Sequence, residues 1–303
     1  MSSDSRTFFM WALVDIMFRP QLGIGGRECN ILIMKRIKNW MIVAFSFVAL
    51  CFTSCDRNGG EGGGGGSGNQ DYPSTAQVIR NAVKDIDGNK YDAVKIGDQV
   101  WMASNLRTTR YADGTSIPLG TTLIEETPCR YAPGLGQTNE ENMANVPTYG
   151  YLYNWVAVMH NESSSNANPS GVQGICPNGW HVPSDAEWAQ LTNYVSRQDE
   201  YCCRYESKKI AKALASTTGW VDAEDVCMVG YDQSSNNATG FLAFPAGIRD
   251  NGFGGFGKYA DFWSSTEPFD DFAGMWDLEY DLAVVVRSAS PKSIGYSVRC
   301  LRD

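Results

Sequence analysis

The fold is decided by a stretch that combines a cysteine, an Asn-Gly turn, two prolines and a helix start: Cys176-Pro177-Asn178-Gly179-Trp180-His181-Val182-Pro183-Ser184-Asp185-Ala186-Glu187-Trp188. Ser184 and Glu187 have the spacing of a capping box, in which each residue satisfies the backbone amide of the other. Asp185 places negative charge in the first turn, where the helix dipole favours it. The pattern predicts a helix that begins directly after Ser184.

Apolar residues at helical spacing continue this helix. Trp188, Leu191 and Val195 fall on one face and are expected to pack against the rest of the body. A second helix is expected over 206–216, ended by Gly219.

Short strands are expected on both sides of these helices. Turn residues at 87–89 and 97–98 predict an antiparallel meander. The aromatic run at 149–155 is expected to fill the core, and residues 120–147 are expected to form a long loop. Further strands are predicted at 241–248, 262–264, 282–287 and 293–301. The sequence therefore indicates an α+β domain with short antiparallel strands, two helices and long loops.

The N-terminal region has the architecture of a secretory signal peptide. A basic segment begins at Met34 and is followed by an apolar run over 41–52, which is shorter than the about 20 residues that span a bilayer. Residues 52–55 resemble a bacterial lipobox, although Phe52 stands where leucine is commonest. Residues 34–54 are therefore interpreted as the signal peptide and Cys55 as the lipidated residue. An ordinary signal peptide or a short membrane anchor are the alternatives.

Residues 1–33 show no such pattern and are interpreted as lying upstream of the true start, Met34. A glycine-rich stretch completes 55–71, and its composition is that of a flexible tether. No second linker or repeat follows, so residues 72–303 are predicted to be one domain. The expected location is the cell envelope, with the protein lipid-anchored in the outer membrane and exposed at the surface.

The charge of the chain limits its partners. Removal of residues 1–54, which hold six basic and three acidic residues, changes the net charge from −9 to −12. Such a charge argues against nucleic acid and is compatible with neutral glycans, basic proteins or bound cations.

Six motifs are distributed along the body: Asp87-Gly88-Asn89-x-Tyr91, Ile96-Gly97-x-Gln99-x-Trp101-Met102-Ala103-x-Asn105-Leu106, Tyr149-Gly150-x-Leu152-Tyr153-Asn154-Trp155, Cys176-Pro177-x-Gly179-Trp180-His181-Val182-Pro183, Trp263-Ser264-Ser265-Thr266-Glu267 and Ser297-Val298-Arg299-Cys300. Together they resemble the Fibrobacter succinogenes major paralogous domain. Members of this family are typically secreted or lipid-anchored surface proteins without an assigned biochemical activity. Residues 182–188 and 298–300 also resemble the formylglycine-generating family, which implies a C-type-lectin-like fold with paired terminal strands.

The body contains an even number of cysteines, as expected in an oxidising compartment: Cys129, Cys176, Cys202, Cys203, Cys227 and Cys300. The family motifs imply a Cys176–Cys300 disulfide. Cys227 is expected to pair with Cys202 or Cys203, leaving Cys129 for the other. A zinc site is not expected, because the chain has no CxxC pair and only two histidines.

One acidic stretch holds the candidate ligand-binding residues: Trp263, Glu267, Asp270, Asp271, Trp276 and Asp277. An exposed Trp276 would provide a ring for stacking on a sugar. Oxygen ligands from Glu267, Asp270, Asp271 and Asp277 would suit calcium. The asparagine that C-type lectins use after Glu-Pro is absent here, so a solvated acidic loop is the alternative.

These observations favour a non-catalytic binding or adhesion module whose ligand is a glycan or a surface protein. The first alternative is a structural or tip subunit of a surface appendage. The second is an enzyme akin to formylglycine-generating proteins, which would need two reactive cysteines. No catalytic residue and no cofactor other than calcium is expected.

Overall fold

Helix α5 (Asp185–Val195) begins where the capping box predicts. In this computed structural model, which describes residues 72–122 and 127–303, the Ser184 amide donates to Glu187 Oε2 at 3.0 Å. The Glu187 amide donates in turn to Ser184 Oγ at 3.2 Å. The predicted signal peptide, Cys55 and the tether lie outside the described residues.

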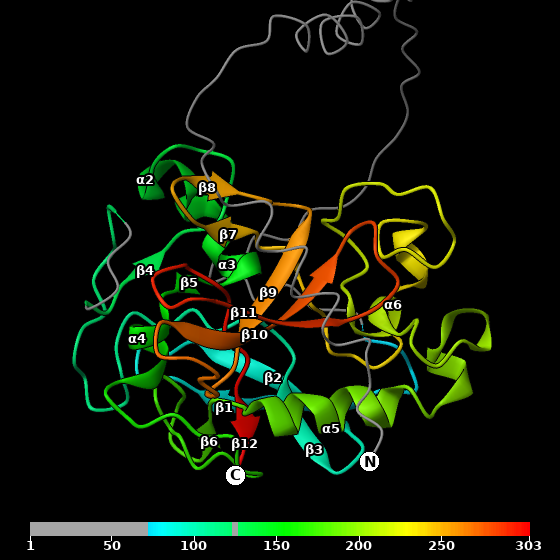
Figure 1. Cartoon of the computed structure of the whole chain (residues 1–303), viewed down its shortest axis with the longest axis horizontal. Coiled ribbons are helices and arrows are strands. Elements are labelled where there is room, and N and C mark those ends of the chain that lie inside the picture. Colours follow the sequence, from blue (N-terminus) through cyan, green and yellow to red (C-terminus); the bar gives the residue numbers. More distant parts are fainter. Residues whose placement is uncertain (1–71, 123–126) are drawn as a thin grey trace, which may run out of the picture. The chain divides into compact units, whose positions relative to one another are not determined.

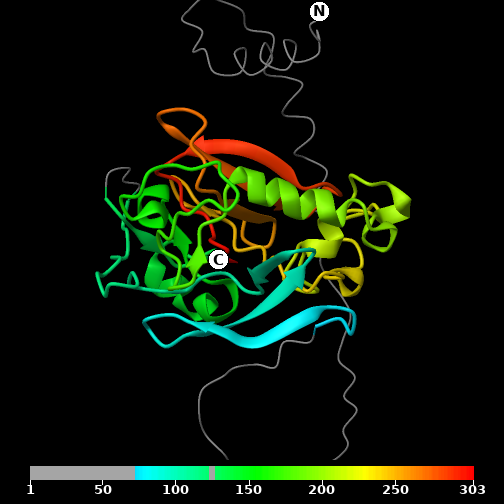
Figure 2. The ribbon, with the colours of Figure 1, turned by 90° about the horizontal axis from the view of Figure 1, so that it is seen from below.

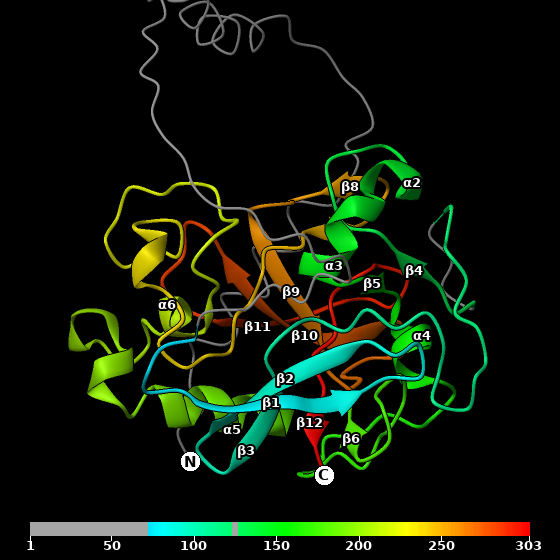
Figure 3. The same ribbon diagram turned by 180° about the vertical axis from the view of Figure 1, so that it is seen from behind.

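A five-stranded antiparallel sheet forms one side of the domain (Figure 1; Figure 3). Its order is β1 (Gln77–Lys84), β2 (Lys90–Ile96), β3 (Gln99–Met102), β12 (Leu301–Arg302) and β6 (Trp180–His181). The first three strands are the predicted meander. Leu301 pairs with Trp101 on one side and with His181 on the other, so the last strand joins the meander to the segment that precedes α5.

A three-stranded sheet forms the opposite side. Its central strand is β10 (Phe272–Glu279), flanked by β9 (Tyr259–Trp263) and β11 (Val286–Pro291). Figure 2 shows β1 and β2 on one side of the body and β11 on the other, with α5 between them. The Trp188 ring on α5 lies 4.7 Å from that of Trp101 and 6.0 Å from that of Trp276, so this helix joins the two sheets.

Shorter elements complete the domain. Two small sheets pair β4 (Arg130–Tyr131) with β5 (Leu152–Tyr153) and β7 (Ile248–Arg249) with β8 (Phe253–Gly254). The remaining helices of the described residues have at most five residues: α2 (Asn139–Asn142), α3 (Val146–Tyr149), α4 (Trp155–Met159) and α6 (Ala211–Leu214). Single 3-10 turns are η1 (Met143–Asn145), η2 (Asp199–Tyr201), η3 (Cys203–Tyr205) and η4 (Gln233–Ser235).

Several predicted elements are wrong in extent. The helix expected over 206–216 is reduced to α6, because the chain turns back there and the Cys203 amide donates to the Lys209 carbonyl. The strand expected over 241–248 is present only at β7. Residues 120–147, expected to be a loop, contain β4 and two short helices. The largest omission is β10, whose residues were interpreted as an acidic loop.

Two disulfides bind the body together. Cys176 and Cys300 are bonded as predicted, and closing so long a loop stabilises the fold by about 4–5 kcal/mol. Cys227 is bonded to Cys203. The expectation that Cys129 would pair with the remaining cysteine is wrong, because Cys129 and Cys202 are both buried free thiols.

Arg299 lies beside that disulfide and is completely buried. Its guanidinium donates to Asn105 Oδ1 at 2.8 Å and to the Met102 carbonyl at 2.9 Å. It also donates to the carbonyls of residues 241 and 242, and it stacks on the Phe241 ring. Burial lowers its pKa to about 9. One side chain thus joins β3, the 241–242 segment and the C-terminal segment.

Replacing Arg299 with methionine should lower the free energy of unfolding by about 3–5 kcal/mol, because four buried acceptors lose their donor. Urea denaturation of the oxidised protein measures this loss. Arg302→Met, at an exposed position of β12, is the matched control and should change stability little. Equal unfolding midpoints for the two variants would contradict this role of Arg299.

Candidate functional site

The predicted aromatic platform is not at the surface. Trp276 lies on β10 with 7% of its surface exposed, and its indole nitrogen donates to Asp185 Oδ1 at 2.9 Å. Asp185 also accepts two hydrogen bonds from Arg287. Trp263 is fully buried, and its indole donates to the Tyr153 carbonyl. The prediction of an exposed ring at Trp276 is therefore wrong, and the candidate Trp263 has no surface available for a ligand.

The four carboxylates predicted to bind calcium point to different places. Glu267 pairs with Lys292, whereas Asp270 and Asp271 are exposed on the β9–β10 loop. Asp277 is buried on β10 opposite Asp261 of β9. Within residues 72–122 and 127–303, no group of three or more acidic, histidine or cysteine side chains is arranged to hold a metal ion.

Asp261 and Asp277 are a buried carboxyl pair. Burial and the neighbouring Asp277 charge raise the pKa of Asp261 well above its ordinary value. Burial also raises the pKa of Asp277, whose Oδ1 has no hydrogen-bond partner in the described part of the chain. Burial and the Asp277 charge raise the pKa of nearby Glu279 to about 7. The pair is favourable while protonated and costly when both groups ionise.

The contribution of this pair to stability should therefore decrease as the pH rises. The folded pKa values lie above the unfolded value of 3.8, so this contribution is fully present below about pH 4 and is lost as the pH rises through the raised values. Asp261→Asn should increase the free energy of unfolding at neutral pH by on the order of 1–2 kcal/mol. Urea titrations across the pH range measure this change. The exposed Asp271→Asn is the control, and an equal pH dependence for both variants would refute the account.

An open cleft of about 310 Å³ lies between the β2–β3 turn and α5. We call it the Tyr194 cleft, and its lining residues are Ile96, Asp98, Gln99, Gln190, Asn193, Tyr194 and Arg197. Gln190, Asn193, Tyr194 and Arg197 share the exposed face of the helix and its end through their spacing of three, four and seven residues. Tyr194 is a large aromatic residue with 39% of its surface exposed.

The glycine of the β2–β3 turn makes room for this ring. Gly97 has φ +61°, a conformation that other residues rarely adopt. A Cβ atom at this position would lie 2.8 Å from Cδ2 of Tyr194, so only glycine permits the ring to lie against the turn. The floor is fixed by Gln99, whose amide donates to the Glu187 carbonyl at 3.0 Å.

The rim of the Tyr194 cleft has hydrogen-bond donors and hydrogen-bond acceptors that are free to bind a ligand. The side chains of Asp98, Asn193 and Arg197 and the Tyr194 hydroxyl have no hydrogen-bond or ion-pair partner among the described residues. Gln190 accepts from Asn168 at 2.6 Å and keeps its own amide donor free. The cleft can therefore both donate to and accept from a ligand, beside an apolar ring face.

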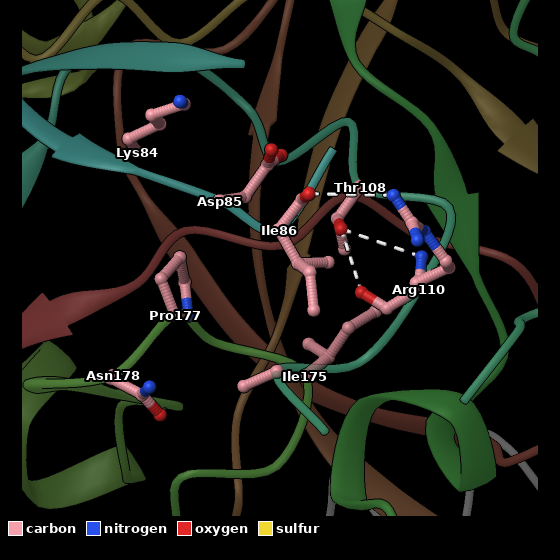
Figure 4. Close-up of a pocket in the computed structure, with 9 residues that line it drawn as sticks. Lys84, Asp85, Ile86, Thr108, Arg110, Ile175, Pro177 and Asn178 are labelled. Carbon is pink, nitrogen blue, oxygen red and sulfur yellow. Dashed lines mark hydrogen bonds between the residues drawn. The ribbon is translucent and has the colours of Figure 1, made fainter. Parts of the chain in front are cut away.

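A second cleft of about 220 Å³ lies at the end of the β1–β2 hairpin (Figure 4). We call it the Lys84 cleft, and it is lined by Lys84, Asp85, Ile86, Thr108, Arg110, Ala112, Ile175, Pro177 and Asn178. It combines an apolar interior with a polar rim. Neither cleft contains a residue of the predicted ligand-binding set.

Both histidines make structural contacts, His181 through hydrogen bonds and His160 through ring stacking. His181 Nε2 lies 2.9 Å from Glu187 Oε1, and Nδ1 lies 2.7 Å from Asp303 Oδ1. Burial opposes protonation of His181, but its hydrogen bonds to these two carboxylates outweigh burial and raise its pKa. His160 stacks on Tyr111 at 3.6 Å. His181 is not paired with a thiol, because Cys176 is in a disulfide.

Sequence reasoning missed the Tyr194 cleft because it followed only the buried face of α5. The pattern that could have indicated the cleft lies on the opposite face of α5, where polar and aromatic residues follow one another at helical spacing: Gln190, Asn193, Tyr194 and Arg197. The family motif at Ile96-Gly97 marks the turn, but only the fold brings that turn against the helix.

The family model for the Fibrobacter succinogenes major domain matches residues 94–302. The chain belongs to this family. No curated protein and no solved structure matches it. Family membership and two disulfides indicate an extracellular or surface protein. No helix in residues 72–122 or 127–303 is long and apolar enough to cross a membrane.

Proposed function

We propose that this family member is an exported, lipid-anchored and non-catalytic binding module, and that the Tyr194 cleft binds a neutral glycan. The observation that carries the proposal is the exposed Tyr194 ring surrounded by polar side chains without partners. Sugars present an apolar ring face and many hydroxyls, each of which can donate and accept.

The charge balance favours a neutral sugar. Asp98 would accept from hydroxyls and Arg197 would donate to them, so the cleft has one charge of each sign. An acidic sugar would gain from Arg197 and be repelled by Asp98. The cleft volume of about 310 Å³ is at the lower end of the roughly 300–1,000 Å³ of small-molecule sites, which suits one or two sugar rings.

The proposed anchor is Cys55, in the cell envelope and at the outer-membrane surface. Its support is the signal-peptide pattern before it, the tether after it and the disulfides of the body. We also propose a C-type-lectin-like arrangement. Its support is the pairing of β12 with β3 in the sheet that contains β1 and β2.

Tyr194→Ala should weaken glycan binding by up to about tenfold, because the loss of an aromatic contact of up to roughly 1.5 kcal/mol corresponds to that factor. A glycan array identifies the neutral oligosaccharide, and calorimetric titration measures the change. Tyr205→Ala is the matched control, since Tyr205 is 82% exposed and lines neither cleft.

Equal affinities of the two tyrosine variants would refute the assignment to this cleft. A wild-type protein that binds no glycan on the array would refute glycan binding itself and favour the alternative of a structural or tip subunit of a surface appendage.

Cys55→Ser should release the protein from membranes, because the serine cannot carry the thioether-linked lipid. Detergent phase partitioning and mass spectrometry of the mature N-terminus measure the change. Cys51→Ser, in the apolar run before the proposed processing site, is the control and should leave the anchor intact. An unmodified peptide that runs across residues 54–56 in the mature wild-type protein would contradict lipidation.

A further inference from the structure

His181 lies where the five-stranded sheet, helix α5 and the C-terminal segment meet. It is 3% exposed and pairs in β6 with Leu301 of β12. Its Nε2 lies 2.9 Å from Oε1 of Glu187 in the first turn of α5. Its Nδ1 lies 2.7 Å from Oδ1 of Asp303, which directly follows β12. One imidazole therefore bridges the start of the helix and the end of the sheet.

The two contacts determine the protonation state of this ring. A neutral imidazole has one nitrogen that donates and one that only accepts. An ionised carboxylate only accepts, so it makes no hydrogen bond with an accepting nitrogen. Because a carboxylate faces each nitrogen of His181 at hydrogen-bond distance, both nitrogens need a proton. The ring is then an imidazolium.

Neither carboxyl is suited to supply the missing proton itself. Oε2 of Glu187 accepts from the backbone amides of Ser184 at 3.0 Å and Ser170 at 3.2 Å, and such donors favour the ionised form. The Asp303 side chain is 60% exposed, so water solvates its charge. The second proton therefore belongs to His181.

The other charged side chains of these elements are directed elsewhere. Asp185 of α5 accepts from Arg287. Arg302 of β12 lies opposite Trp180, so it projects from the other face of the sheet than Leu301 does. Strand β3 and the rest of β6 contain no charged residue. The charges that face the ring are thus those of the two carboxylates.

We propose that His181 is a pH-sensitive latch, which holds Asp303 and the end of β12 as an imidazolium and releases them when it loses its second proton. A neutral ring would turn one lone pair toward a carboxylate oxygen, which is repulsive. Glu187 is fixed by the cap of α5, whereas the exposed Asp303 can move into solvent. Strand β12 has two residues, and the Asp303 amide donates to the Gly179 carbonyl at 3.2 Å, so release of Asp303 frays this end of the sheet.

The direction of the pH dependence follows from the surroundings of the ring. Burial alone would lower the pKa of His181, but the hydrogen bonds to Glu187 and Asp303 outweigh burial and raise the pKa above its ordinary value of 6.5. The contribution of the latch to stability is therefore fully present below about pH 6.5 and is lost as the pH rises through the raised value.

Long-range proton–nitrogen NMR of the oxidised full chain tests the bridge. The chain has two histidines, so His160→Gln leaves only the signals of His181. Both ring nitrogens should carry protons below pH 6.5. Asp303→Asn should lower the pH at which His181 loses its second proton, because the amide keeps an acceptor but has no charge. The exposed Asp271→Asn is the matched control and should leave that pH unchanged. A neutral ring below pH 6.5, or equal titrations of the two variants, would overturn the bridge.

Amide hydrogen exchange tests the release of β12. After correction for the intrinsic effect of pH, the amides of residues 301–303 should lose protection as His181 titrates, while that of the buried Leu191 on α5 stays protected. In Asp303→Asn this loss should move to lower pH together with the titration of the ring. A His181 that keeps both protons, or a β12 that keeps its protection, throughout the pH range in which the domain is folded would overturn the release. No ligand takes part in these measurements, so their outcome is independent of glycan binding.

Discussion

A fully buried guanidinium, with no carboxylate partner in the part of the chain that the structure describes, is the interaction on which the domain most depends. Arg299 satisfies carbonyls from β3 and from residues 241–242, and its charge is stabilised by these dipoles and by the faces of Phe241 and Phe262. Desolvation of an arginine is costly, so each acceptor has to be in place. The neighbouring Cys176–Cys300 disulfide holds the segment that positions it. The hydrogen bonds of Arg299 and this disulfide together fix the position of the C-terminal segment.

The same interaction explains one failure of sequence reasoning. Residues 241–248 are apolar and were expected to form a strand, but the carbonyls of Phe241 and Leu242 are taken by Arg299. Leu242 also has φ +56°, outside the extended region. In contrast, α5 and the meander were predictable because the capping box and the turn residues act locally.

The candidate site was harder to predict because acidic residues gave a misleading signal. Asp270, Asp271 and Asp277 suggested a solvated loop, whereas β10 is buried over most of its length between β9 and β11. A central strand tolerates Asp277 because burial raises the pKa of Asp277 and of Asp261 opposite it, which favours the uncharged forms. The two clefts instead form where segments distant in sequence come into contact. Local sequence patterns do not predict such tertiary contacts.

The position of β12 also bears on how the protein is made. This strand lies between β3 and β6, and its residues follow the rest of the sheet in the chain. Before Arg299 and Leu301 have emerged, the sheet is in two pieces and Cys176 has no partner. A growing chain therefore cannot complete this sheet or the Cys176–Cys300 disulfide until its last few residues are available, so both are late events in folding.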